Sequence, residues 1–314
     1  MRYTFPLYSS RAASGRRMST AQTAQMTRAS RAGAYLALTK PDVSLLVLMT
    51  TGAGFYMGAR GAVDWLRLAH IVFGTMLIAA GTAALNHYLE RDSDRHMRRT
   101  ASRPLPSGQL QPKEALFFGV GLALVGAADL WIAGGSLASV LGIITCVSYL
   151  LAYTPLKKRT VWATFVGAFP GAVPPMIGWA AATGSLDRGA WALFGILFLW
   201  QFPHFHAIAW MYREDYSRAG ILMLPVVDPD GSRTFRQIVL SAIGLIGIGL
   251  LPSLLGLTGV FYFFGALVVS TGLLQVCLWA ASSKSNVRAK WLMHATVLHI
   301  PILLGLMMYD KVAR

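Results

Sequence analysis

Long uncharged stretches dominate the chain, and short segments between them carry most of its charge. No Asp, Glu, Lys or Arg occurs in 68–89, 130–156, 160–186, 189–212 or 237–283. A helix needs roughly 20 apolar residues to cross the hydrocarbon core of a bilayer, and the last of these stretches is long enough for two crossings. The pattern predicts nine transmembrane helices, at 42–59, 68–88, 114–133, 136–154, 163–183, 189–211, 238–256, 260–281 and 291–309.

The length of these stretches predicts an all-α, polytopic membrane protein, because strands of a membrane barrel show only about 10 alternating residues. Of the 28 lysines and arginines, 23 lie in the N-terminal segment or after the second, fourth, sixth and eighth helices. Nine helices place all of these segments on one face, which the positive-inside rule makes cytoplasmic. The net charge of +15 therefore follows membrane topology and does not indicate a nucleic-acid surface.

The first 40 residues are basic and contain no acid. We predict a disordered tail over 1–40 and one transmembrane domain over 41–314. A tail of this composition resembles a mitochondrial transit peptide, which leaves the mitochondrial inner membrane as one location. We favour the other interpretation, a cytoplasmic tail on a protein of the bacterial inner membrane.

The most informative polar segment follows the second apolar stretch. Asn86, Glu90 and Asp94 are spaced by four residues, so a continuing helix places the three side chains on one face. Mg²⁺ favours such oxygen ligands and usually takes one or two carboxylates, with water and substrate phosphates completing its shell. A solvated helix end is the alternative, but acids at membrane depth are costly and usually functional. We predict a Mg²⁺ site here.

Basic side chains near this acidic face make a diphosphate its natural partner, because guanidinium groups bind phosphate oxygens in pairs. A second cluster follows the fourth helix, on the same predicted face. Singly, each arginine could equally belong to a solvated loop. The candidates are Arg91, Arg98, Arg99, Arg103, Lys157 and Lys158.

A third polar cluster begins inside the sixth apolar stretch. His204 and Asp215 are eleven residues apart, almost three whole turns, so they share a stripe if a helix starts at Pro203 and persists. His206 lies about 200° away from His204 on such a helix, which disfavours a joint metal site. His204 is either a site residue or a hydrogen-bonded core histidine, and the sequence leaves both open.

Together these motifs resemble the UbiA superfamily of membrane prenyltransferases, and within it the branch that acts on heme. The resemblance covers about 36–310. In two places the sequence departs from the family: Glu90 stands where Asp is usual, and Met211 and Ala219 replace the acids of a second regular box around Asp215. The motifs that carry the resemblance are Asn86-x3-Glu90-x3-Asp94 with Arg99-Thr100 and Arg103-Pro104, Tyr153-Thr-Pro-Leu-Lys157, Pro174-Pro175 with Gly178-Trp179, Trp200-Gln-Phe-Pro-His204-Phe, Asp215-Tyr216 and Met223-Leu-Pro225.

The resemblance implies a UbiA-type bundle with a central cavity, which transfers farnesyl from farnesyl diphosphate to a vinyl group of protoheme IX and yields heme O. It implies Mg²⁺ held by Asn86, Glu90, Asp94 and Asp215, with Arg213 added to the diphosphate-binding residues and His204 contacting heme. A downstream heme A synthase becomes an expected partner. Two alternatives stay open: prenylation of a quinone precursor or other aromatic acceptor, and a membrane transporter.

Overall fold

A computed structural model describes residues 31–313, and its secondary structure there is helical apart from one isolated bridge between Thr258 and Lys311. Eight helical segments in this range are long and apolar enough to cross a membrane, and a shorter apolar helix precedes them. These nine segments correspond to the nine predicted helices. The elements are α2 (Pro41–Gly58), α3 (Trp65–Asp94), α4 (Pro112–Gly134), α5 (Ser136–Ser148), the π-helix η1 (Tyr149–Tyr153), α6 (Thr154–Leu156), α7 (Ala163–Ala172), α8 (Pro174–Thr183), α9 (Arg188–Met211), α10 (Arg213–Arg218), α11 (Leu224–Val227), α12 (Ser232–Leu254), α13 (Val260–Ser283) and α14 (Asn286–Tyr309).

Two predicted helices are interrupted. The segment predicted over 163–183 divides at Val173 into α7 and α8, directly before the pair Pro174 and Pro175. Proline removes a helical hydrogen bond and crowds the preceding turn, which accounts for the division. The segment predicted over 136–154 changes to the π-helix η1 before α6. Single π turns inside helices are frequent at functional sites.

The predicted tail over 1–40 was too long. Residues 31–38 form a helix, while residues 1–30 lie outside the described part of the chain. Ala34 and Leu38, four residues apart, are buried together against Leu105 and Leu110 of the α3–α4 loop. Two apolar side chains one turn apart are enough to dock this helix. The basic composition of the whole tail does not reveal this local pattern.

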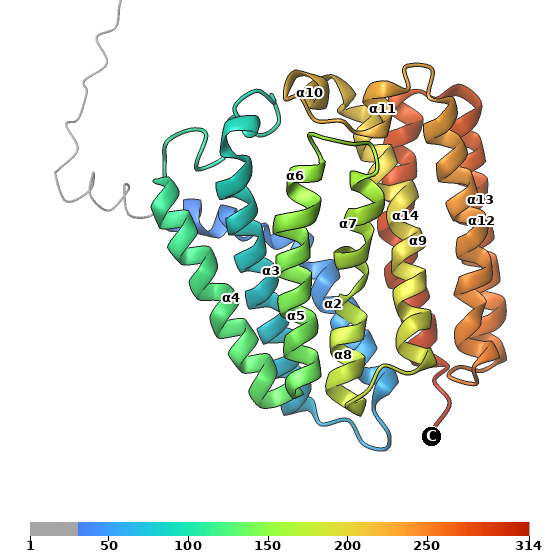
Figure 1. Cartoon of the computed structure of the whole chain (residues 1–314). Helices are drawn as coiled ribbons and strands as arrows, with labels where there is room; N and C mark the ends of the chain where they lie inside the picture. The colour runs from blue at the N-terminus through green and yellow to red at the C-terminus, as the bar shows by residue number, and fades with distance from the viewer. Residues whose placement is uncertain (1–30, 314) are drawn as a thin grey trace, which may run out of the picture.

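The helices form one bundle in which the connections α3–α4, α6–α7 and α13–α14 lie at one end with α10 and α11 (Figure 1). We call this the charged end, because it carries the loops that hold most of the Lys and Arg. The loops that the nine-helix prediction places on one face therefore lie at one end of the bundle. The charged end brings the last turns of α3, the residues after α6, and α10 to the same level of the molecule.

Helix α2 crosses α8 at very short range. A Cβ atom on Gly54 would lie 2.0 Å from the carbonyl oxygen of Pro175, and one on Gly178 would lie 1.9 Å from that of Thr51. Small residues at such crossings let membrane helices approach closely and gain dispersion contacts. The glycines therefore fix the position of α2, which begins directly after Lys40 at the charged end.

Candidate functional site

Asn86 lies inside α3 and is 1% exposed. Its side-chain oxygen accepts a hydrogen bond from Lys40 Nζ at 3.1 Å, and its Nδ2 donates to Thr154 Oγ1 at 3.3 Å. The amide thus connects α3 with the start of α2 and with α6. A buried amide with both ends engaged is held in one orientation, with its oxygen on the side of the cation.

Glu90 is one turn further along α3 and forms a buried ion pair. Lys157 Nζ donates to Glu90 Oε1 at 2.8 Å, and each side chain is only 13% exposed. The ammonium group also lies 4.4 Å from the ring centre of Tyr153. Burial opposes its charge, but Tyr153 and Glu90 hold the pKa of Lys157 well above its usual value. Lys157 is therefore a fixed cation beside the acidic face.

Asp94 ends α3, and its side chain is fully buried. Both of its carboxylate oxygens accept from Nη1 of Arg103, at 2.9 and 2.8 Å. The Thr100 hydroxyl donates to the Asp94 backbone oxygen at 2.8 Å, which folds the loop back onto the helix end. The motif Arg99-Thr100-x2-Arg103 thus places a guanidinium on the last acid of the predicted face.

Asp215 on α10 belongs to the same region. Its Oδ2 accepts from the backbone N–H of Arg99 at 3.4 Å, and its Oδ1 accepts from Arg218. The Arg99 guanidinium lies over the Tyr212 ring at 4.7 Å and donates to Tyr216 Oη at 3.2 Å. The α3–α4 loop and α10 are therefore joined, and the Arg99 side chain is engaged with tyrosines. A role of Asp215 in holding Mg²⁺ stays a prediction.

The predicted stripe joining His204 to Asp215 does not form. Helix α9 begins at Arg188, passes through Pro203 and ends at Met211, and the backbone turns at Tyr212 (φ −110°, ψ 20°) before α10. The His204 ring stacks on Trp200 with centres 4.8 Å apart, and its Nδ1 lies 2.8 Å from Thr296 Oγ1 of α14. His204 is thus a half-buried histidine that is hydrogen-bonded within the bundle. A contact of His204 with heme stays a prediction.

Three predicted diphosphate ligands are not brought to the acidic face. Arg213 donates to the Trp210 carbonyl at 2.7 Å and to Asn286 Oδ1 at 2.9 Å. Arg91 donates to the carbonyl of Tyr88 at 2.6 Å, and Arg98 is exposed. The sequence could not predict these partners, because side chains close together in the sequence point in different directions at a helix end or in a loop.

Sequence reasoning missed Lys40 as a site residue. Its backbone adopts the left-handed conformation (φ 48°), which is unusual for a side chain of this kind and directs the chain from the helix over 31–38 into α2. Burial, and next the positive charge of Arg103, lower the pKa of Lys40 to about 7. A lysine followed by proline, at the membrane boundary of the first apolar stretch, was the sequence signal that could have indicated this site residue.

A cavity of about 300 Å³ borders the acidic face on the side of Lys157. Its polar lining includes Glu90, Ser93, Lys157 and Lys158, the last of which is exposed. The remaining wall comes mainly from leucines and isoleucine: Leu89, Leu150, Leu151 and Ile221. The combination of one acid, two lysines and an apolar wall suits an amphipathic diphosphate.

Among residues 31–313, no group of three or more His, Cys, Asp and Glu could hold a metal ion. That result excludes a complete protein cage within this range, but Mg²⁺ bound with a diphosphate needs only one or two carboxylates. Glu90 and Asp94, with the oxygen of Asn86, supply hard oxygen atoms from a single helix. The donor set therefore fits Mg²⁺ whose remaining ligands are water and phosphate oxygens.

Residues 47–299 match the UbiA prenyltransferase family. The chain belongs to this family. A protoheme IX farnesyltransferase of Solibacter usitatus is 51% identical over 286 residues, covering 88% of this chain and 98% of the relative. The protoheme IX farnesyltransferase of Koribacter versatilis is 44% identical over 288 residues, covering 88% and 93%.

Solved structures share the UbiA fold at low sequence identity. A digeranylgeranylglyceryl phosphate synthase matches with a TM-score of 0.73 and 17% identity, covering 89% of this chain and 98% of its own. A UbiA homolog from Archaeoglobus fulgidus bound to GPP and Mg²⁺ matches with a TM-score of 0.62 and 15% identity, covering 87% and 99%. The likeness confirms the helical bundle architecture of the UbiA-family chain.

Proposed function

We propose that this UbiA-family chain transfers the farnesyl group of farnesyl diphosphate to a vinyl group of protoheme IX, forming heme O and diphosphate. The observation that carries the proposal is 51% identity to a protoheme IX farnesyltransferase over 98% of its length. The site supports it chemically, since buried acids and cations alternate beside a cavity with an apolar wall. The charged end would face the bacterial cytoplasm, and the product would pass to a heme A synthase.

Asn86, Glu90 and Asp94 would hold Mg²⁺, with Asp215 reaching the same substrate from α10. When bound, Mg²⁺ supplies electrostatic stabilisation of the negative charge that develops on the leaving diphosphate. Lys157 and Lys158 would bind phosphate oxygens through their N–H groups, Arg103 would hold the Asp94 carboxylate in place, and Arg99 would hold α10 through Tyr212 and Tyr216. No nucleophilic Ser or Cys is required.

The remaining walls would protect the reacting carbon. Leu89, Leu150, Leu151 and Ile221 line the cavity beside Glu90 and Lys157, where they would pack on the first isoprene unit and exclude water. Departure of diphosphate leaves an allylic cation, and the heme vinyl group captures it. The new carbon–carbon bond leaves a cation on the second vinyl carbon, and water adds there and releases a proton to give the hydroxyl group of the product.

The test is an assay of the purified full chain in detergent with farnesyl diphosphate and Mg²⁺. We expect farnesylated heme and diphosphate to form in equal amounts with protoheme IX, and both to disappear when EDTA removes Mg²⁺. Turnover of a quinone precursor in place of protoheme would contradict the acceptor assignment. Absence of diphosphate release with every acceptor, in protein that still binds farnesyl diphosphate, would favour a carrier.

Glu90 gives a graded test of the acidic face. Glu90→Gln keeps the length of the side chain but removes the charge that pairs with Lys157, so we expect activity to fall by at least about 100-fold. Glu90→Asp keeps the charge and restores the residue usual in the family, so it should retain activity within about 10-fold and change mainly the Mg²⁺ concentration for half-maximal rate. Equal activity of the two variants would contradict the metal assignment.

A further inference from the structure

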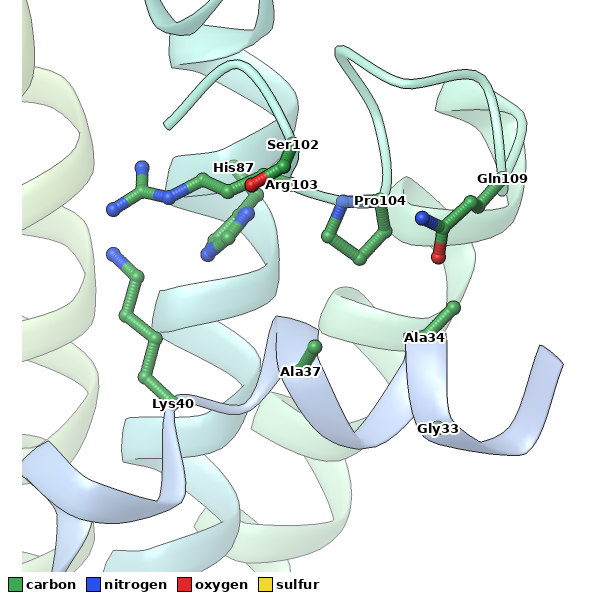
Figure 2. A pocket seen from close by; sticks show the side chains of 9 residues that line it. All are labelled: Gly33, Ala34, Ala37, Lys40, His87, Ser102, Arg103, Pro104 and Gln109. Atoms are coloured by element: carbon green, nitrogen blue, oxygen red, sulfur yellow. The ribbon is translucent and has the colours of Figure 1, made fainter. Parts of the chain in front are cut away.

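A second cavity, of about 420 Å³, lies beside Lys40 and Arg103, the hydrogen-bond partners of Asn86 and Asp94. It is enclosed by the helix over 31–38, by α3 and by the α3–α4 loop (Figure 2). Its lining includes no Asp or Glu among the described residues. The side chains that give it chemical character are Lys40, His87, Ser102, Arg103 and Gln109.

His87 is the unexplained group of this cavity. It lies on α3 one residue after Asn86 and is 2% exposed, and neither ring nitrogen has a hydrogen-bond partner in the described structure. Figure 2 shows its ring directed into the space beside the ends of Lys40 and Arg103. Buried polar groups are nearly always hydrogen-bonded, so an unpaired imidazole aimed into a cavity indicates a missing polar ligand.

The charge of the cavity indicates the sign of that ligand. Lys40 uses one contact for Asn86, and Arg103 engages Asp94 through Nη1 alone. A lysine amino group carries more than one N–H and a guanidinium has five, so both side chains retain donors that can face the cavity. Ser102 and Gln109 add neutral donors at its edge. The cavity is therefore suited to an oxyanion.

The two cavities differ in the side chains that line them. The cavity beside Lys157 contains Glu90 of the acidic face, whereas none of Asn86, Glu90 and Asp94 lines the cavity of His87. A diphosphate bound with Mg²⁺ must lie against the acidic face and is served by Lys157 and Lys158. Lys40 and Arg103, which line the cavity of His87, then remain for the acceptor, whose acidic groups are its two propionates.

We propose that this cavity binds a propionate carboxylate of the tetrapyrrole acceptor, with Arg103 supplying charge and Lys40 and His87 donating hydrogen bonds. The inference rests on the proposed function and specifies how its acceptor is held. His87 is a binding residue for the acceptor. It takes no part in diphosphate departure.

The test compares protoheme IX with its dimethyl ester, which has the same ring and vinyl groups but no carboxylates. We expect the wild-type chain to bind and farnesylate the ester with a KM about 10- to 100-fold higher, as loss of a charged hydrogen bond predicts. His87→Phe should raise the KM for protoheme IX by a similar factor and leave the KM for farnesyl diphosphate unchanged. In this variant, the acid and the ester should differ much less.

Two further variants keep the result interpretable. His87→Gln restores a donor and should recover part of the affinity for protoheme IX, while His294→Phe, at an exposed histidine of α14, should behave as wild type. Equal use of acid and ester by the wild-type chain would overturn the inference and leave the farnesyl transfer intact. A rise confined to the KM for farnesyl diphosphate would assign the cavity to diphosphate. Failure of the wild-type chain to farnesylate protoheme IX at all would instead reject the proposed function.

Discussion

Asp94→Asn is expected to reduce the turnover number by at least about 100-fold in folded protein, because the change removes the negative charge while keeping the size of a fully buried side chain. The variant loses a hard ligand for Mg²⁺, and it leaves Arg103 without its carboxylate partner. Turnover of farnesyl diphosphate and protoheme IX should be measured over a range of Mg²⁺ concentrations. Excess Mg²⁺ should restore only a small part of the rate.

The neighbouring Asp92 provides a matched control on the same helix. Its side chain is 69% exposed and its partner Arg91 lies 3.8 Å away, so Asp92→Asn should change the rate by less than about two-fold. Elution of both variants as a single detergent-solubilised species would show that insertion is intact. If Asp94→Asn and Asp92→Asn turned over equally fast, the acidic face could not be the metal site.

Gly178→Ala should destabilise the bundle, because it inserts a methyl group where α8 crosses α2. The added Cβ would lie 1.9 Å from the backbone oxygen of Thr51 and 2.6 Å from the backbone nitrogen of Phe55, and backbone atoms cannot rotate away as a flexible side chain can. Helix α2 would have to move from α8, so we expect the unfolding midpoint in detergent to fall by at least about 5 °C.

Gly305→Ala is the control for this effect. Gly305 lies inside α14, and a Cβ there would meet no atom within 4 Å. Alanine has the higher helix propensity, by about 1 kcal/mol, so the midpoint should stay equal or rise. An unchanged midpoint in Gly178→Ala would mean that α2 and α8 can separate at little cost, contrary to the packing described here.

The pairing of acids with cations explains how the site can be buried at the end of membrane helices. An isolated charge there would be expensive, whereas Glu90 with Lys157 and Asp94 with Arg103 are neutral pairs with direct hydrogen bonds. The pairs also prepare the site for its substrate. A metal ion and a diphosphate bring charges of both signs, and the acids and cations that receive them are already adjacent.

The sequence alone determined the features that depend on length and period. A bilayer requires long apolar stretches, so the nine helices and the sidedness of their loops could be predicted from uncharged runs and from lysine and arginine positions. The helical period placed Asn86, Glu90 and Asp94 on one face of α3 before any tertiary contact was known. The family motif pointed to the same residues.

Only the tertiary structure decided which side chains meet this face. Lys40 and Lys157 contact it across separations of 46 and 67 residues, and no periodic signal in the sequence encodes such a pairing. The end of α9 at Met211 separates His204 from Asp215, and the packing of α14 gives His204 its partner Thr296. Helix period is a local property of the backbone, whereas these contacts depend on how helices cross and where loops return.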